Sequence, residues 1–463
     1  MPAIDRDLMA EVSRVVAERM GLHFPEERWP DLGRGLASAA RELGFAHPDA
    51  TLSWLSIPEL TTGQVETLAS HLTVGETYFF RDPASFAALE QEILPALMAK
   101  RAGAGRILRL WSAGCCTGEE AYSLAITCSR AVPDLRAWNL SILATDINPK
   151  FLAKAEAGRY SEWSFRGTPA ALRERFFSPA PDKSFVVAPT FKQLVHFSYL
   201  NLAEDLYPSL HNHTNAMDVV FCRNVLMYFT PDHQRRVVAA LHRSLVDGGY
   251  LFVDPVEAGP SLFPMFVTDH IGGVIVFRKT SQSPGVEPPA ALVSSAAPSA
   301  LPWPEPALLV ALPRPESIAP VAVAQPILPS LTSLQPDSLM LAQALANQGK
   351  LAEALVSCQK AIAARRTDPA AYLLCATICH ELGQLDEAAT ALGKVLYLDQ
   401  DSILAHHALG RLYRRLGKRR GSRRHLAIAL ALLSARTRDE LVPESDGMTC
   451  GRLEESARAL MGA

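Results

Sequence analysis

The sequence predicts an α/β protein that is preceded by a helical domain and followed by an all-α array. Strand and helix patterns alternate between residues 106 and 280, which indicates a mostly parallel sheet covered by helices. A 34-residue period of small residues follows residue 336 and indicates paired helices. Because 463 residues exceed one typical domain, we expect two or three domains.

Composition excludes several classes of protein. With 48% hydrophobic and 20% charged residues, the chain can bury real cores. Its net charge of −3 creates no field that favours nucleic acid, and it lacks a groove of interleaved basic and aromatic residues. The start, MPAIDRDLMAEV, does not fit a signal peptide, and no apolar run is long enough to span a bilayer. We expect a cytoplasmic protein with no nucleic-acid partner and no direct membrane insertion.

The eight cysteines do not form a metal-binding pattern. Cys115 and Cys116 are adjacent, and Cys375 and Cys379 are four residues apart, so neither pair is a Cys-x-x-Cys motif. We interpret them as small reduced core residues, which suits a reducing compartment, and we expect no metal.

Residues 1–73 are predicted to form a helical domain. Apolar residues three or four apart mark two helices: Leu8, Val12, Val15 and Val16 in the first, and Leu32, Leu36 and Leu43 in the second. Residues 61–72 suggest a third helix. Arg28, Arg34 and Arg41 are either a solvated face or a docking face for an acidic or helical partner.

The next segment, TVGETYFFRDP, begins the second domain, residues 74–280. Asp82 suits an N-cap and Pro83 a first helical position, which predicts a helix over residues 84–100. Arg81 follows three aromatic residues, and an arginine held in this way near a site can orient a carboxylate bidentately. A structural salt bridge is the alternative role.

The stretch from Arg106 to Asn148 has the pattern of a nucleotide-type site. A buried strand over residues 106–111 leads into the turn SAGCCTG, a helix over 121–130 and a second strand that ends at Asp146. Small residues in the turn let a ligand approach the backbone, and an acid at the end of the next strand suits a ribose diol. The alternative is an ordinary tight turn, with Thr117 and Glu120 forming a capping box.

The remaining sheet elements follow in order. A helix over 154–158 leads to a small excursion with a strand at 184–188, and the third core strand begins at 194 and ends at Asn201 and Leu202. A buried strand over 217–222 precedes Arg223 and Asn224, and a helix capped by Thr230 and Pro231 then runs over 232–245 and ends at Gly248 and Gly249. Strands over 250–253 and 273–278, with residues 263–267 nearby, complete the sheet in antiparallel orientation. A ligand should lie at the carboxyl ends of the parallel strands.

Residues 281–336 hold thirteen prolines and few charges, which predicts a disordered linker. Beyond it, three columns of small residues recur every 34 positions: Gly349, Gly383 and Gly417; Ala342, Ala376 and Gly410; Ala354, Ala388 and Ser422. This period is the tetratricopeptide signature and predicts repeats over residues 337–435, with a tail over 436–463. Such repeats hold a protein or peptide partner in a groove.

The third repeat is basic. Its cationic residues are Arg411, Arg414, Arg415, Lys418, Arg419, Arg420, Arg423 and Arg424. They form either a solvated capping helix or a surface for an acidic partner.

Several motifs between residues 8 and 280 occur in one order: GETYFFRDPASF, LRLWSAGCCTGEEAYSLAI, ATDINPKFLAKAEAGRYSE, YLNL and FCRNVLMYF. In this the chain resembles the chemotaxis receptor methyltransferases of the CheR type. The resemblance implies a Rossmann-like, S-adenosyl-L-methionine-dependent methyltransferase sheet with a small antiparallel subdomain. It also implies O-methylation of glutamate side chains on the cytoplasmic helices of methyl-accepting chemoreceptors. The fused repeats resemble methyltransferases of alternative chemosensory pathways, including surface-sensing ones.

The resemblance also assigns site residues. It places Thr77, Arg81, Gly114, Glu120, Asp146, Asn201, Leu202, Arg223 and Asn224 around the cofactor and Tyr228 near the reaction centre, with Arg81 also positioning the substrate. Glu120 would contact the methionine part, Asp146 the ribose, and Asn201 with Leu202 the adenine. Two departures stand out: Gly75 replaces a frequent asparagine, and residues 37–40 are poor in the basic residues of the usual receptor-docking helix.

Two other functions remain open. The chain could be a non-catalytic scaffold that binds S-adenosyl-L-methionine and acts through its repeats, although the intact acid and arginine positions argue against this. It could also methylate another substrate. Residues 254–257 read Asp-Pro-Val-Glu, which differs from the Asn/Asp-Pro-Pro-Tyr motif of amino methylation on bases. Release of the methyl group as methanol by mild base would identify a carboxyl ester.

Overall fold

The computed structural model describes residues 6–45, 60–101, 106–280, 338–445 and 447–462. The predicted linker over residues 281–336 lies outside these described residues. The described residues on both sides of it belong to one compact unit. Within the described ranges, no helix is both long enough and apolar enough to cross a membrane.

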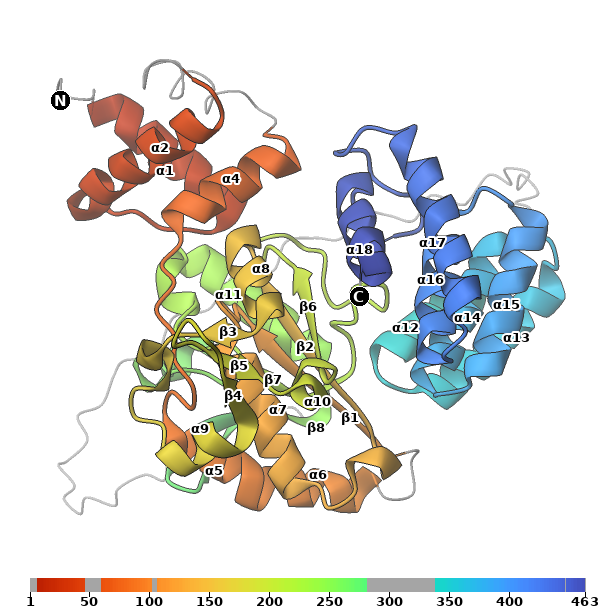
Figure 1. Ribbon diagram of the computed structural model, residues 1–463, viewed down its shortest axis with the longest axis horizontal. Helices are drawn as coiled ribbons and strands as arrows, with labels where there is room; N and C mark the ends of the chain where they lie inside the picture. Colours follow the sequence, from red (N-terminus) through yellow and green to blue (C-terminus); the bar gives the residue numbers. More distant parts are fainter. Residues whose placement is uncertain (1–5, 46–59, 102–105, 281–337, 446, 463) are drawn as a thin grey trace, which may run out of the picture. The chain divides into compact units, whose positions relative to one another are not determined.

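The N-terminal domain is helical, as the sequence predicts (Figure 1). Its helices are α1 (Arg6–Met20), α2 (Trp29–Glu42) and α4 (Thr62–Leu72), with a short 3₁₀ turn, η1 (Glu26–Arg28), before α2. Thr61 and Gln64 form a capping box at the start of α4. Val12, Leu32 and Leu68, one from each helix, are almost fully buried in a shared core.

The helix predicted over residues 84–100 is present but not uniform. It consists of α5 (Pro83–Ala88), a π-helical turn η2 (Leu89–Ile93) and α6 (Leu94–Arg101). Pro83 occupies its first turn. Asp82, however, makes no side-chain cap: it has a left-handed φ of 61°, and its carboxylate accepts hydrogen bonds from Ser85 Oγ and the Arg223 guanidinium. Asp82 therefore occupies the predicted N-cap position, but its carboxylate caps no backbone amide because tertiary contacts recruit it.

The main sheet has seven strands in the order β6-β2-β1-β7-β8-β10-β9. The strands are β1 (Ile107–Ala113), β2 (Asn139–Asp146), β6 (Val195–Tyr199), β7 (Met217–Phe221), β8 (Leu245–Phe252), β9 (Phe266–Ile271) and β10 (Val274–Lys279). The pairs from β6 to β8 are parallel, and β10 is antiparallel to both neighbours. This confirms the predicted antiparallel finish. Gly248 and Gly249 lie within β8 rather than after the helix, because α11 already ends at Ser244.

The sheet is accompanied by the helices that the alternating pattern predicts. They are α7 (Glu119–Ala131), α8 (Pro149–Ala157), α10 (Pro189–Lys192) and α11 (Pro231–Ser244), with 3₁₀ turns η3 (Leu135–Ala137), η5 (Leu226–Tyr228), η6 (Pro255–Glu257) and η7 (Pro260–Leu262). Thr230 caps α11 by accepting a hydrogen bond from the His233 amide.

The small antiparallel subdomain is also present. Its sheet has the order β3-β5-β4, from β3 (Arg159–Tyr160), β5 (Phe185–Val187) and β4 (Phe177–Pro179), with η4 (Glu162–Phe165) and α9 (Ala170–Phe176) between them. Phe79 packs into it, 4.8 Å from the Phe165 ring and 4.7 Å from the Phe177 ring. Phe79 and Phe80 thus belong to the core and do not surround Arg81, in contrast to the expected aromatic setting.

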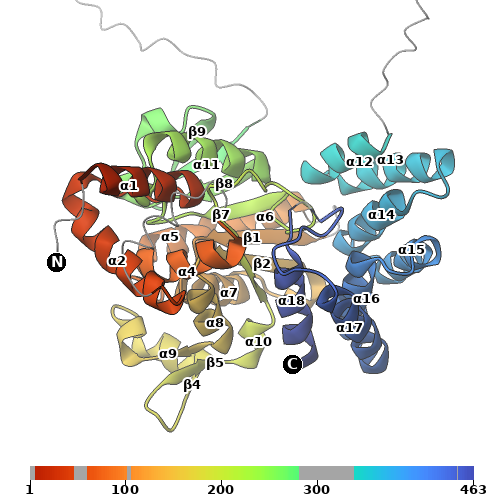
Figure 2. The same cartoon turned by 90° about the horizontal axis from the view of Figure 1, so that it is seen from above.

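The repeats form antiparallel helix pairs (Figure 2). The helices are α12 (Ser338–Asn347), α13 (Leu351–Ala364), α14 (Pro369–Glu381), α15 (Leu385–Leu398), α16 (Ile403–Arg415) and α17 (Arg419–Ser434), followed by α18 (Cys450–Gly462) within the predicted tail. Gly349, Gly383 and Gly417 have φ of 78°, 77° and 71°, a left-handed conformation that glycine adopts readily. A Cβ on Gly410 would lie 2.5 Å from Leu426 Cγ, so the small residue permits the helix contact.

Candidate functional site

A cavity of about 420 Å³ lies at the carboxyl ends of the parallel strands. This volume is within the range of roughly 300–1,000 Å³ for small-molecule pockets. All ten site residues named from the sequence line it: Thr77, Arg81, Gly114, Glu120, Asp146, Asn201, Leu202, Arg223, Asn224 and Tyr228. They come from positions spread over some 150 residues, and the parallel sheet brings them together at one edge.

The turn after β1 brings the backbone against this cavity. Gly114 has a φ of 78°, and a Cβ at this position would lie 2.4 Å from Val225 Cγ2. The amides of Gly114 and Cys115 both donate to the Thr145 carbonyl, which ties the turn to β2. Glycine is therefore required both by the backbone conformation and by the close approach.

Asp146, the last residue of β2, fixes the same turn. Its Oδ2 accepts a hydrogen bond from the Cys116 amide and its Oδ1 one from the Asn148 amide, each at 2.8 Å. Burial raises the pKa of Asp146 to about 6, although these amides lower it in part. Each oxygen retains a further lone pair, so the carboxylate can also accept bonds from a diol in the cavity.

Thr117 and Glu120 do not form the capping box offered as an alternative. Gly118 is the N-cap of α7 and has no side chain, and Thr117 Oγ1 donates to Glu119 Oε2 instead. Glu120 accepts a hydrogen bond from Ser112 Oγ at 2.7 Å and lines the cavity. Burial raises the pKa of Glu120, and the charge of Arg223 and the Ser112 hydrogen bond lower it only in part.

Arg223 connects the two sides of the cavity, and its side chain is only 1% exposed. It donates to the Arg81 carbonyl at 2.7 Å and to Asp82 Oδ2 at 3.2 Å. Its guanidinium also lies 3.9 Å from Glu120 Oε2 and 3.8 Å from Asp254 Oδ2. Its buried Nε has no hydrogen-bond partner among the described residues, so a donor remains available at the wall of the cavity.

Arg81 is held by its own segment. Its Nη1 donates to the Glu76 carbonyl at 2.9 Å, and its guanidinium carbon lies 5.8 Å from the centroid of the Tyr78 ring. Of the three arginines that line the cavity, Arg28 and Arg223 have carboxylate partners. Within the described residues Arg81 has no carboxylate within 4.0 Å. It therefore does not form the structural salt bridge that was its alternative role.

The N-terminal domain closes one side of the cavity, which sequence reasoning missed. The His23 amide donates to the Tyr228 carbonyl at 2.6 Å, and Leu22 forms a β-bridge with Phe229. Asn201 Nδ2 donates to the Arg19 carbonyl at 2.8 Å. Met20, Leu22, His23, Phe24 and Arg28 line the cavity. No local sequence signal marks these residues, because only the docking of two domains brings them there.

Gly75 is explained by a neighbour distant in sequence. A Cβ at Gly75 would lie 2.7 Å from Phe151 Cζ, and Phe151 itself lines the cavity. The ring of Phe151 therefore occupies the space that a larger residue at position 75 would need.

Glu257 is a further buried acid that the sequence analysis did not select. Its Oε2 accepts hydrogen bonds from the amides of Asn224 at 2.8 Å and Asp254 at 3.2 Å, and its Oε1 accepts one from Met227 at 3.0 Å. Burial raises the pKa of Glu257, although these three amides lower it in part. The carboxylate thereby fixes the segment from Asn224 to Met227 that forms one wall of the cavity.

Replacing Glu257 by glutamine should weaken methyl transfer about tenfold or more. The amide NH₂ would face a backbone N–H, and a hydrogen bond to a charged group contributes about 1.5–3 kcal/mol. We expect a higher KM for the methyl acceptor, measured in steady-state assays, because the wall moves. Glu174→Gln, an exposed glutamate of α9, is the matched control and should behave as the wild type. Equal kinetics for both variants would contradict this role.

The strand order, the antiparallel β10 and the acid at the end of β2 beside a small-residue turn together define an S-adenosyl-L-methionine-dependent methyltransferase. The site fits this cofactor: the backbone at Gly114 lines the cavity, Asp146 offers a buried acceptor, and Arg223 Nε is a donor without a partner among the described residues. Residues 75–262 match the model of the CheR methyltransferase, SAM binding domain, and residues 341–412 match a tetratricopeptide repeat.

Curated relatives extend this match along the chain. The chain is 32% identical over 397 residues to the probable biofilm formation methyltransferase WspC of Pseudomonas aeruginosa, covering 83% of this chain and 90% of that protein. It is 31% identical to the protein of the same name from Pseudomonas putida, covering 89% and 95%. It is 37% identical to chemotaxis protein methyltransferase 1 of Pseudomonas aeruginosa, covering 42% and 70%. The chain belongs to the CheR-type, S-adenosyl-L-methionine-dependent protein methyltransferases and carries C-terminal tetratricopeptide repeats.

Proposed function

We propose that this enzyme methylates glutamate side chains on the cytoplasmic helices of a chemoreceptor, in a chemosensory pathway of the kind that serves biofilm formation. The observation that carries the proposal is Arg81, a cavity-lining guanidinium without a carboxylate partner among the described residues. A substrate carboxylate is the group that such a cation binds best, because the pair forms charge-assisted, bidentate hydrogen bonds. Two long relatives are named as biofilm formation methyltransferases, which supports the choice of pathway.

When bound, S-adenosyl-L-methionine supplies a methyl group from its sulfonium, and a carboxylate oxygen takes this group to give an ester and a neutral thioether. A glutamate is already ionised at neutral pH, since its ordinary pKa is about 4.3, so the protein needs no general base. The task of the chain's residues is alignment, which can supply on the order of 7–11 kcal/mol. We assign Arg81 to the acceptor carboxylate, Asp146 to the ribose and Tyr228 to the wall of the reaction centre.

The substrate class is tested by transfer of labelled methyl from S-adenosyl-L-methionine to membranes that contain the host's chemoreceptors. The full chain should label receptor bands, and mild base should release the label as methanol, because carboxyl esters hydrolyse readily whereas methylated amines do not. Receptors whose methylated glutamates are replaced by alanine are the control and should stay unlabelled. Base-stable label, or no label despite measurable cofactor binding, would exclude glutamate methylation of these receptors.

Arg81→Ala should lower turnover about a hundredfold while cofactor affinity changes only a few-fold. The guanidinium orients the acceptor, and loss of charged hydrogen bonds costs about 1.5–3 kcal/mol. Single-turnover methyl transfer and calorimetric titration with S-adenosyl-L-methionine measure the two effects. Arg159→Ala is the control, since Arg159 pairs with the exposed Asp182 at 2.9 Å and does not line the cavity. Full turnover in the Arg81 variant would remove Arg81 from substrate positioning.

A further inference from the structure

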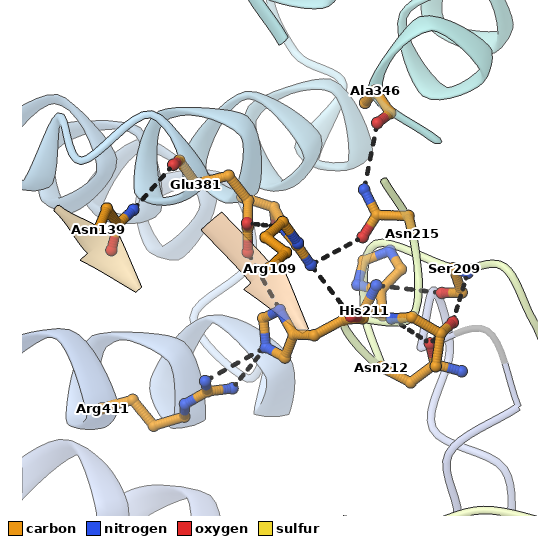
Figure 3. Close-up of polar contacts among 12 residues, drawn as sticks. Arg109, Asn139, Ser209, His211, Asn212, Asn215, Ala346, Glu381 and Arg411 are labelled. Atoms are coloured by element: carbon orange, nitrogen blue, oxygen red, sulfur yellow. Dashed lines mark hydrogen bonds and ion pairs between the residues drawn. The ribbon is translucent and has the colours of Figure 1, made fainter. Parts of the chain in front are cut away.

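A network of polar contacts outside the methyltransferase site joins the catalytic domain to the repeats. Arg109 of β1 forms an ion pair with Glu381, the last residue of α14, and the two side chains are only 7% and 11% exposed (Figure 3). Arg109 also donates to the His213 carbonyl at 3.0 Å and to Asn215 Oδ1 at 3.3 Å. One guanidinium therefore binds both the repeats and the segment of residues 206–216, which we name the 206–216 loop.

The 206–216 loop lies between β6 and β7 and contacts three of the repeat helices. His213 Nδ1 lies 3.1 Å from Glu381 Oε1, and His213 Nε2 lies 3.2 Å from the Arg411 guanidinium of α16. Asn215 Nδ2 donates to the Ala346 carbonyl of α12 at 3.1 Å (Figure 3). The contacts thus come from α12, α14 and α16, the first helix of each repeat pair, which together we name the docking face.

Glu381 is the carboxylate at the centre of this contact, beside Arg109 and His213. Burial alone would raise the pKa of Glu381, but the charge of Arg109 and the hydrogen bond with His213 outweigh this effect. The pKa of Glu381 is therefore lowered, and the carboxylate stays ionised. Burial lowers the pKa of His213, although Glu381 raises it in part. Removing one partner of a buried pair leaves the other charge uncompensated, which makes such a contact strongly dependent on both halves.

Apolar packing accompanies the polar network. Leu210 of the loop is 1% exposed and belongs to the same buried cluster as the core residues of α12, α14 and α16. A Cβ on Gly349, in the turn of the first repeat, would lie 3.0 Å from the Ala216 Cβ, so the two surfaces meet closely. At the opposite end of the contact, the Arg415 guanidinium donates to Asn139 Oδ1 at 3.4 Å.

A second contact involves α18. The Arg452 guanidinium lies 3.1 Å from the centroid of the Tyr199 ring and 3.3 Å from Glu66 Oε1 of α4. A Cβ on Gly447 would lie 2.7 Å from Leu206 Cδ2. Gly447 and Arg452, which follow the last repeat pair, therefore contact the start of the 206–216 loop, the end of β6 and the N-terminal domain.

We infer that the docking face of the repeats binds the 206–216 loop of the same chain, so that another protein can occupy this face only by displacing the loop. Repeat proteins bind partners along the extended surface that their stacked helices create. Here the Arg109–Glu381 ion pair and the loop residues Leu210 and His213 already cover part of that surface. The first partner of the repeats is therefore the catalytic domain of the same chain.

The test uses the full chain with a site-specific protease sequence placed between residues 285 and 336. After cleavage, the two wild-type halves should still co-elute in size-exclusion chromatography at micromolar concentration. Glu381→Ala in the repeats and Leu210→Asp in the catalytic domain should each weaken the association at least a hundredfold and separate the halves. Glu387→Ala, an exposed acid on α15 of the same repeat pair, is the matched control and should leave the halves together.

Hydrogen exchange on the uncut chain gives a second reading that does not need cleavage. The Thr214 amide donates to the Ser209 carbonyl within the loop, and docking should protect such amides. Exchange of residues 209–216 should accelerate in Glu381→Ala and not in Glu387→Ala. Separation of the wild-type halves after cleavage, or unchanged association and exchange in both Glu381→Ala and Leu210→Asp, would overturn the inference. Circular dichroism of each variant establishes that the helices remain folded.

Discussion

Arg223→Gln should reduce methyl transfer at least a hundredfold and lower the thermal stability of the enzyme. Arg223 is the cation among Asp82, Glu120 and Asp254, and it also holds the Arg81 carbonyl. Removing one partner of a buried ion pair costs about 3–5 kcal/mol, because the opposite charges stay buried without compensation. Since about 1.4 kcal/mol corresponds to tenfold, even the lower figure exceeds a hundredfold if the folded site bears the cost.

The measurement combines methyl-transfer rate, calorimetric cofactor affinity and a thermal melt. Arg235→Gln is the control, because Arg235 pairs with Asp232 on the exposed start of α11. An exposed pair of this kind contributes at most about 1 kcal/mol. Arg223→Lys should be intermediate, because it keeps the charge but not the planar fork that reaches two acceptors. A Gln variant with near wild-type rate would show that Arg223 does not organise the site.

Asp146→Asn should weaken the binding of S-adenosyl-L-methionine about 10- to 100-fold. The buried carboxylate would lose its charge, and a hydrogen bond to a charged acceptor contributes about 1.5–3 kcal/mol. The new NH₂ group would also face the amide of Cys116 or Asn148, which now donates to the carboxylate. Calorimetry with the cofactor measures the effect, and unchanged affinity would remove Asp146 from the ribose site.

The pKa of Asp146 adds a pH signature to the same variant. Burial raises this pKa to about 6, and a bound diol needs the ionised carboxylate as acceptor. Protonation below pH 6 therefore competes with binding, so the affinity of the wild type should fall by up to about tenfold per pH unit below 6. Asp146→Asn has no proton to gain and should show a flatter profile between pH 5 and pH 7. Parallel profiles would mean that another group controls the pH dependence.

Much of the fold follows from local sequence patterns. The apolar strands around Trp111 and Val220 and the glycines at 349, 383 and 417 are recognisable without any tertiary information, because periodicity and turn chemistry depend on neighbouring residues. The site residues named from the sequence line one cavity, since parallel strands end at the same edge of a sheet. Their individual roles remain proposals that the variants above test.

Local sequence patterns gave an incomplete picture where a side chain binds a partner that is distant in the sequence. Asp82 has the sequence context of a helix cap and occupies the N-cap position, yet its carboxylate binds Arg223 instead of a backbone amide. The basic residues of the third repeat fall into two groups for the same reason. Lys418 and its neighbours are exposed, whereas Arg411 contacts His213. Propensity describes what a segment does alone, and a stronger tertiary partner overrides it.

The sequence by itself therefore determined the class of each domain, the cofactor and the set of residues at the carboxyl edge of the sheet. Only the tertiary structure decided that Met20, His23 and Arg28 close the cavity, that Glu257 fixes its wall and that the 206–216 loop contacts the docking face. The physical reason is the range of the interactions involved. Helix and strand patterns record forces between near neighbours, whereas a buried ion pair such as Arg109 with Glu381 depends on surfaces that only the folded chain brings into contact.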